Sequence, residues 1–276
     1  MADRAHGAVA LTRERETPPP KLALREVVVT RRSSSGRIVP AIDHVTFDVF
    51  QGEFVCILGP SGCGKTTILN MLAGLDRPAA GDVLLDGVSI NGPGPDRAVL
   101  FQEPALFPWL SVVENVEFAL RYRGVASSER RRQAMGWLEN VHLTGAADRQ
   151  PHELSAGMRQ RAALARALAC DPDVLLGDEP FGALDAQARE LLQNEVQRVW
   201  VESRGQKTFV FVTHNVREAA LLADRVLVMS AAPGTLLEEQ RIYAPRPRDL
   251  DDALVSRVVS EIHEVLMREV GKGGET

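Results

Sequence analysis

The feature that most constrains the fold of this chain is the glycine-rich segment GPSGCGKTT, which starts at residue 59. An apolar run that begins at Glu53 precedes it, and a run with helical character that ends at Ala73 follows it. This order predicts a buried strand, a tight loop and a helix, because glycines let successive backbone N–H groups turn toward one anion. The pattern G-x-x-x-x-G-K-[ST] is matched by Gly59, Gly64, Lys65 and Thr66.

Such a loop predicts a nucleotide site. Lys65 supplies a positive charge for the outer phosphates, and the Thr66 hydroxyl is a suitable ligand for Mg²⁺. The alternative is a glycine-rich turn with an incidental lysine, but lysine occurs only four times in the chain. The strand before the loop and the helix after it also favour nucleotide binding.

A second informative segment runs from residue 154 to 185, LSAGMRQRAALARALACDPDVLLGDEPFGALD. A Ser-Ala-Gly turn at 155–157 opens its helix and offers free N–H groups and the positive end of the helix dipole to an anion. Its buried strand ends in Asp178 and Glu179, which are able to serve a metal ion and a water molecule. Taken alone, the segment also fits a capped helix followed by a strand with a polar end.

Three further polar residues are placed where a site would need them. Gln102 ends an apolar strand in VLFQEP, and His214 ends another in FVFVTHN. Asp185 follows a short turn and is also a plain candidate for a helix N-cap. Each has an ordinary structural alternative, but open α/β sheets bind ligands at the carboxyl ends of their strands, where these residues lie.

The remaining pattern predicts an α/β fold, in which an antiparallel β section leads into a mainly parallel sheet covered by helices. Residues 1–20 are predicted to form a disordered tail, and 31–36 (RRSSSG) a polar loop. The expected strands are 22–29, 45–50, 53–58, a hairpin at 81–90 around Asp86 and Gly87, 174–177, 208–213 and 226–229. The expected helices are 66–73, 115–122, 128–140, one after Ser155, 186–203, 216–222 and 250–270.

Composition argues against several classes of function. The formal net charge of −5 gives no general electrostatic footprint for nucleic acid, so we expect no nucleic-acid partner. The cysteines, Cys56, Cys63 and Cys170, lack metal-site spacing and fit a reducing cytosol. Because no apolar run reaches about 18 residues and no signal-peptide core is present, we expect a chain that neither spans a membrane nor is exported.

In their order, the motifs GPSGCGKTT, FQEP, LSAGMRQR, VLLGDEP, GALD and VTH resemble the ATPase subunits of ATP-binding cassette (ABC) transporters, from about Leu22 to Pro245. The resemblance implies a P-loop NTPase of ABC type over 21–245, with a helical subdomain inserted at about 115–169 and a helical tail at 246–276. It implies contacts to ATP from Gly59, Pro60, Ser61, Gly62, Cys63, Gly64, Lys65, Thr66, Thr67, Gln102, Ser155, Gly157 and Asp185.

The resemblance also implies a mechanism with ATP and Mg²⁺. Lys65 would neutralise the outer phosphates, Glu179 would polarise the attacking water, and His214 would hold the γ-phosphate. Ser155 and Gly157 would close over the ATP of a second copy in a head-to-tail dimer. The implied catalytic residues are Lys65, Gln102, Glu179 and His214, and the implied metal ligands are Thr66, Gln102 and Asp178.

The segment ALFPWLSVVENV and the tail APRPRD resemble the nitrate, sulfonate and taurine branch of bacterial importers. This implies uptake of a small anion, membrane permease subunits, a periplasmic or lipoprotein solute-binding protein, and a peripheral place on the cytoplasmic face of the inner membrane. Trp109 is either a core side chain or part of the surface that docks on the permease, and composition alone favours the core. An exporter ATPase, or an importer of another solute, is the alternative.

Other classes fit the sequence less well. A chromosome or repair ATPase would carry a long coiled-coil insertion, and the interval between the loop and the LSAGM segment has no sustained heptads. A translation factor would need two cassettes in one chain. A non-catalytic nucleotide-binding module would not require Lys65, Glu179 and His214 together.

Some positions depart from the family pattern. Ala156 stands where glycine is usual and Met158 where glutamine is common. Gly177 replaces an aliphatic residue, which we expect to loosen its strand by about 1 kcal/mol. No aromatic residue lies between Lys21 and His44 to stack on adenine. We expect Arg37, Ile38 or Val39 to pack against the base instead.

Overall fold

The computed structural model describes residues 18–32, 37–182, 184–249 and 252–273, with the backbone alone for 269–273. The tail predicted at 1–20 therefore lies mostly outside the described residues. The strands are β1 Leu22–Arg32, β2 Ile38–Val49, β3 Phe54–Leu58, β4 Ala80–Leu85, β5 Val88–Ser89, β6 Arg97–Leu100, β7 Val174–Asp178, β8 Thr208–Thr213, β9 Arg225–Met229 and β10 Leu236–Arg241. The helices are α1 Lys65–Ala73, α2 Val112–Tyr122, α3 Ser127–Asn140, α4 Ala156–Ala169, α5 Ala186–Glu202, α6 Val216–Leu222 and α7 Ala253–Gly273.

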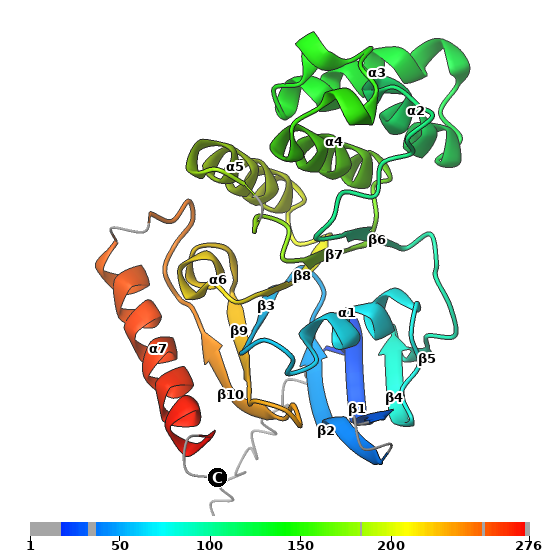
Figure 1. The fold of residues 1–276 in the computed structure, drawn as a ribbon. Helices are drawn as coiled ribbons and strands as arrows, with labels where there is room; N and C mark the ends of the chain where they lie inside the picture. Colours follow the sequence, from blue (N-terminus) through cyan, green and yellow to red (C-terminus); the bar gives the residue numbers. More distant parts are fainter. Residues whose placement is uncertain (1–17, 33–36, 183, 250–251, 274–276) are drawn as a thin grey trace, which may run out of the picture.

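The larger sheet has the strand order β10-β9-β3-β8-β7-β6 and is parallel except for its edge strand β10 (Figure 1). Successive side chains of a strand point to opposite faces, and both faces of this sheet are covered. Along β3, Phe54 and Cys56 join an apolar layer with α5 and α6, whereas Val55 and Ile57 join a layer with α1 and the smaller sheet. This arrangement confirms the predicted α/β fold with a mainly parallel core sheet.

The smaller sheet has the order β2-β1-β4-β5 and is antiparallel, as predicted for the N-terminal section. At its hairpin Asp86 and Gly87 have φ values of 49° and 77°, the left-handed values that a type I′ turn needs. The polar loop predicted at 31–36 is wrong in part, since Arg31 and Arg32 belong to β1 and pair with the first residues of β2. Backbone pairing extends the strand there although its side chains are polar and exposed.

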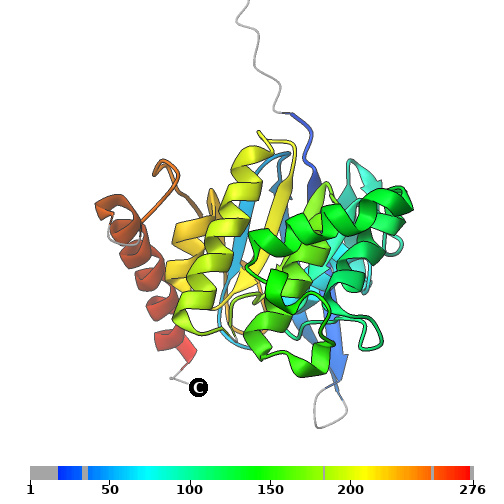
Figure 2. The same cartoon turned by 90° about the horizontal axis from the view of Figure 1, so that it is seen from above.

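Helices α2, α3 and α4 form a layer at the opposite end of the molecule from the smaller sheet (Figure 1). Seen from above, these helices lie in front of the sheets (Figure 2). Ser111 begins α2 with a capping box, in which the Ser111 N–H donates to the Glu114 carboxylate at 2.7 Å. Asn115 is fully buried, and its side-chain amide donates to the carbonyls of Phe107 and Leu110. The segment before α2 is therefore fixed to the helix by a buried amide.

The C-terminal part of the chain adds β10 and α7 to one edge of the larger sheet. The sequence does not predict β10, because LLEEQR is charged and largely exposed; backbone pairing with β9 makes it a strand. Helix α7 packs on α6 and β9 and buries Val255, Val258 and Ile262. Within the described ranges, no helix has both the length and the apolar character that a membrane span requires.

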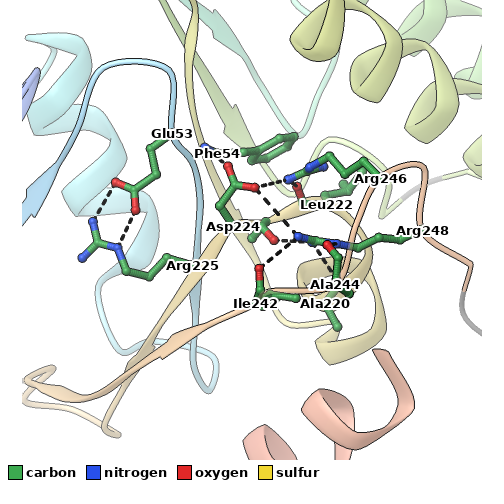
Figure 3. Close-up of polar contacts among 11 residues, drawn as sticks. Glu53, Phe54, Ala220, Leu222, Asp224, Arg225, Ile242, Ala244, Arg246 and Arg248 are labelled. Atoms are coloured by element: carbon green, nitrogen blue, oxygen red, sulfur yellow. Dashed lines mark hydrogen bonds and ion pairs between the residues drawn. The ribbon is translucent and has the colours of Figure 1, made fainter. Parts of the chain in front are cut away.

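Two arginines from the segment after β10 hold the end of helix α6 (Figure 3). The Arg248 guanidinium donates to the carbonyls of Ala220 and Ala223 and to two carbonyls of its own segment. Arg246 donates to the last carbonyl of α6 and pairs with Asp224 at 2.8 Å. The last carbonyls of a helix have no partner within it, so these cations satisfy them and complement the negative end of its dipole. Burial lowers the pKa of Arg248 to about 10.

Candidate active site

The glycine-rich loop connects β3 to α1 at the carboxyl end of the parallel strands. Gly62 and Gly64 have φ values of 80° and 98°, which glycine adopts without strain. A Cβ on Gly64 would lie 2.6 Å from the side chain of Ile42, so the loop packs directly on β2. Gly64 is also the N-cap of α1 and supplies no side-chain cap, which leaves N–H groups at the helix start available to an anion.

Lys65 is held inside this loop. Its Nζ donates to the carbonyl oxygens of Gly59 at 2.8 Å and Pro60 at 3.0 Å, and the residue is buried. The loop therefore places the ammonium group beside the backbone N–H groups at the start of α1. Donors and positive charge gathered in this way suit the outer phosphates of a nucleotide.

A hydroxyl and a carboxylate meet beside the loop. Thr66 Oγ1 donates to Asp178 Oδ1 at 3.0 Å and so joins the start of α1 to the end of β7. Burial raises the pKa of Asp178, and the hydrogen bond from Thr66 opposes that rise. The pair fits Mg²⁺, which binds proteins through one or two such oxygen ligands and completes its shell with water and phosphate.

Glu179 and His214 form a second pair at the same edge of the sheet. Glu179 Oε2 and His214 Nδ1 lie 2.9 Å apart, because the neighbouring parallel strands β7 and β8 end side by side. Glu179 has a φ of 42°, a strained value for a residue with a side chain, and its N–H donates to the Val212 carbonyl at 3.0 Å. Backbone strain of this kind collects at functional residues.

A cavity of about 410 Å³ opens over the loop and brings Lys65, Thr66 and Glu179 into one lining. The rest of the lining comes from the loop and from β1 and β2. The sequence predicts that Arg37, Ile38 or Val39 packs on the base, but none of them lines the cavity and Ile38 is 69 % exposed. The residues of β1 and β2 that line the cavity are Val29, Arg31 and Ala41.

Several predicted site residues do not line this cavity: Gly59, Pro60 and Cys63 of the loop, Asp178 and His214 at the strand ends, and Gln102, Ser155, Gly157 and Asp185. Gln102 is exposed and follows β6, in the same row of strand ends. Ser155 begins α4 and Asp185 begins α5, and each side chain accepts a hydrogen bond from a backbone N–H of its own helix. A Cβ on Gly157 would touch Ala188 at 3.9 Å, so the starts of the two helices face each other.

Aromatic side chains gather on the surface of the helical layer. Trp109 is 72 % exposed, so the composition-based prediction of a core position is wrong. The turn that Asn115 holds directs Trp109 outward, and the Phe107 ring packs on Trp109 and Phe118 with centroids 5.5 and 4.7 Å apart. Phe107, Phe118 and Tyr122 line a groove of about 260 Å³.

A second cavity, of about 90 Å³, is not expected from the sequence and lies behind Glu179 and His214. Glu218 of α6 and Arg189 of α5 line it. The sequence signal that could have placed Glu218 near His214 is their spacing of four residues, about one helical turn.

A phosphate-binding loop after a parallel strand, with a hydroxyl–carboxylate pair and a glutamate–histidine pair at the neighbouring strand ends, defines a P-loop nucleoside triphosphatase. A model of the ABC transporter family matches residues 42–182. Together with the relatives described next, this match shows that the chain belongs to the ABC transporter family.

The chain is 46% identical over 86% of its length to an uncharacterized ABC transporter ATP-binding protein of Methanocaldococcus jannaschii, and covers 88% of that protein. It is 45% identical over 80% of its length to the nitrate import ATP-binding protein NrtD of Synechocystis sp., covering 81% of it. It is 44% identical over 89% of its length to the taurine import ATP-binding protein TauB of Burkholderia pseudomallei, covering 99% of it.

A solved structure gives the same fold. The dimeric, post-hydrolysis state of the ATP-binding cassette MJ0796 bound to ADP and Pi superposes with a TM-score of 0.73 at 32% identity. The match covers 81% of this chain and 100% of that one. The predicted family and fold are thereby confirmed, and the chain is an ATPase of the ABC type.

Proposed function

We propose that this chain is the ATP-hydrolysing subunit of an importer for a small anion such as a sulfonate, taurine or nitrate. The hydrolytic part is supported chiefly by the Glu179–His214 pair, 2.9 Å apart, since Glu179 lines the cavity that also holds Lys65. The import part is supported by relatives named for nitrate and taurine import at 45% and 44% identity.

In this proposal the loop binds the phosphates of ATP. Lys65 leaves its bonds to the loop carbonyls and bonds the β- and γ-phosphate oxygens, while the N–H groups at the start of α1 neutralise their charge. Thr66 and Asp178 would hold Mg²⁺, with Gln102 as a further ligand, and the metal would supply charge neutralisation to the phosphates. Arg31 would cover the face of the base, where its planar guanidinium takes the place of an aromatic ring.

Hydrolysis needs an oriented water and a stabilised γ-phosphate rather than covalent help. Glu179 would accept a proton from the attacking water, and His214 would donate a hydrogen bond to the γ-phosphate while it holds Glu179 in place. Their contact in the structure supports this division of roles, since one ring nitrogen of His214 meets Glu179 and leaves the other for phosphate.

A second copy completes the site in this proposal. Ser155, Gly157 and Asp185 lie outside the cavity that their own loop forms, which supports a role at the nucleotide of another copy. Ser155 and Gly157 would offer the N-terminus of α4 to the γ-phosphate held by the partner chain in a head-to-tail dimer. The related cassette MJ0796 is itself dimeric in its solved structure.

The aromatic surface of Phe107, Trp109, Phe118 and Tyr122 is the proposed docking site for an integral membrane permease. Exposed aromatic side chains beside a groove are typical of protein–protein contacts. The subunit would then sit peripherally on the cytoplasmic face of the inner membrane, and a periplasmic or lipoprotein solute-binding protein would deliver the anion on the other side.

The hydrolytic role is tested with Glu179→Gln, which keeps the shape of the side chain but removes the base. We expect ATPase turnover to fall by about 100-fold or more while ATP binding is kept, as measured by phosphate release and by nucleotide titration. Activity near that of the unmodified protein would contradict the role of Glu179. ATP-driven movement of labelled taurine, sulfonate and nitrate by vesicles with the assembled transporter tests the rest, and outward movement would point to an exporter.

A further inference from the structure

The cavity of about 90 Å³ behind Glu179 and His214 is lined by two charged residues, Arg189 and Glu218, that the reaction proposed above does not use. Glu218 is 6 % exposed, and a carboxyl is rarely buried so completely without a partner or a role. The cavity has room for water, since one molecule occupies about 30 Å³. Each of these two residues contacts the turn that carries one member of the proposed catalytic pair, Glu179 and His214.

Glu218 is connected to the turn that carries His214. Thr213 and Asn215 line the cavity together with Glu218, and the Asn215 N–H donates to Thr213 Oγ1 at 3.0 Å. The Asn215 side chain in turn caps α6 by accepting from the backbone N–H of Glu218 at 3.3 Å. The residues on either side of His214 are therefore bonded to each other and to the start of the helix that carries Glu218.

Arg189 is connected in the same way to the turn that carries Glu179. Its Nε donates to the Phe181 carbonyl at 3.4 Å and its Nη2 donates to the Leu184 carbonyl at 2.8 Å. Within that turn the Gly182 N–H donates to the Glu179 carbonyl at 3.0 Å. The Arg189 guanidinium thus stabilises the backbone turn that contains Glu179.

The pKa of Glu218 depends on its burial and on charged groups of the neighbouring helix and strand ends. Burial raises the pKa of Glu218 to about 7; the Thr213 hydrogen bond and the charges of Arg189 and His214 oppose the rise, and Glu179 adds to it. The buried thiol of Cys56 on β3 faces the same carboxyl. Glu218 is consequently ionised above about pH 7 and neutral well below it.

We propose that Glu218 is a positioning residue for the catalytic pair: its carboxylate, with Arg189 across the cavity, holds the turns that carry His214 and Glu179 at the spacing that hydrolysis requires. The inference rests on the proposed roles of Glu179 and His214. Without the negative charge, the attraction between the Glu218 carboxylate and the Arg189 guanidinium across the cavity is lost. The two turns then separate more readily, and the catalytic contact opens.

The test compares ATPase pH profiles of the full-length protein between about pH 5.5 and 9. In the unmodified protein kcat falls below about pH 7. Glu218→Gln lowers kcat at pH 8 by about tenfold, changes KM for ATP by less than about twofold, and has no acid limb. Its melting temperature at pH 8 is no lower than that of the unmodified protein, because an amide is easier to bury than a carboxylate. Glu218→Asp keeps the charge and restores most of kcat.

Glu195→Gln is the matched control, since Glu195 is equally buried but pairs with Arg198 at 2.7 Å, away from the cavity. It keeps kcat and the acid limb. Unchanged kcat and an unchanged acid limb in Glu218→Gln overturn the proposal, and so does a loss of activity that only follows a lower melting temperature. An active Glu179→Gln protein refutes the proposed function instead, whatever Glu218 does.

Discussion

Gly177 stands directly before Asp178 in β7, and an aromatic ring fixes its identity. A Cβ at this position would lie 2.7 to 2.9 Å from carbons of the Phe211 ring on β8. Phe211 is fully buried and packs on Phe54 and Phe209, with centroids 5.0 and 6.1 Å apart. The glycine therefore makes room for the ring, and the expectation that it only loosens the strand is incomplete.

Gly177→Ala is accordingly expected to destabilise the protein. Overpacking a filled core costs about 1–3 kcal/mol, and replacing a strand glycine by alanine returns about 0.5–1 kcal/mol of backbone entropy. The balance is a loss of about 1 kcal/mol or slightly more. At about 2–4 °C per kcal/mol for a protein of this size, the melting temperature falls by about 2–4 °C. Calorimetry or circular dichroism under reversible conditions measures this shift.

The double variant Gly177→Ala/Phe211→Leu is the companion measurement. Leucine at 211 leaves space for the added methyl group, so the loss in the double variant is smaller than the sum of the two single losses. A Gly177→Ala protein that melts at or above the unmodified protein would refute the packing argument. Strict additivity in the double variant would refute it too.

Three further predictions concern the base, the docking surface and pH. Arg31→Ala raises KM for ATP by about threefold to tenfold, because a stacked cation contributes about 0.5–1 kcal/mol or more to binding. The substitution also narrows the difference between the KM values for ATP and GTP. KM values for both nucleotides that are the same before and after the substitution contradict this. Trp109→Ala keeps the ATPase rate and melting temperature of the isolated subunit but lowers ATP-driven uptake in the assembled transporter, and full uptake would rule out the docking role. Because Glu218 has a folded pKa of about 7 against 4.5 when unperturbed, the folded state binds more protons in that window, so the unfolding free energy contributed by this group falls as the pH rises from 4.5 to 7. Urea titrations across this pH range measure the unfolding free energy, and its dependence on pH is weaker in Glu218→Gln than in the unmodified protein. An equally steep pH dependence in the variant contradicts the raised pKa of Glu218.

The parts of the fold that the sequence predicts well are those with strong local signals. The loop around Lys65 announces itself by glycine spacing, and the strands before Glu179 and His214 are short apolar runs that a covered parallel sheet requires. Asp86 and Gly87 predict the hairpin because few other pairs adopt its backbone angles. In each case the constraint lies within a few neighbouring residues.

The parts that the sequence does not predict depend on contacts between distant segments. Strand β10 exists because β9 offers it a free edge, and Arg31 is in a strand because β2 pairs with it. Trp109 is exposed because the buried amide of Asn115 bonds to the turn that contains Trp109 and fixes its shape. The burial of Glu218 depends on α5 and on two strand ends that are distant in the sequence, and its spacing of four residues from His214 alone does not reveal it.

Because Arg246 and Arg248 hold the end of α6, the structural support of the ATPase site comes partly from a segment late in the chain. The matched family segment ends at residue 182, yet the helix behind His214 is completed by Arg246 and Arg248. A shortened protein that stops before Arg246 would retain every residue of the proposed chemistry and still leave three carbonyls at the end of that helix without donors. We therefore expect the smallest active fragment to extend past Arg248, and a substitution or protease cut in this late segment to disturb the helix that follows the proposed catalytic residue His214.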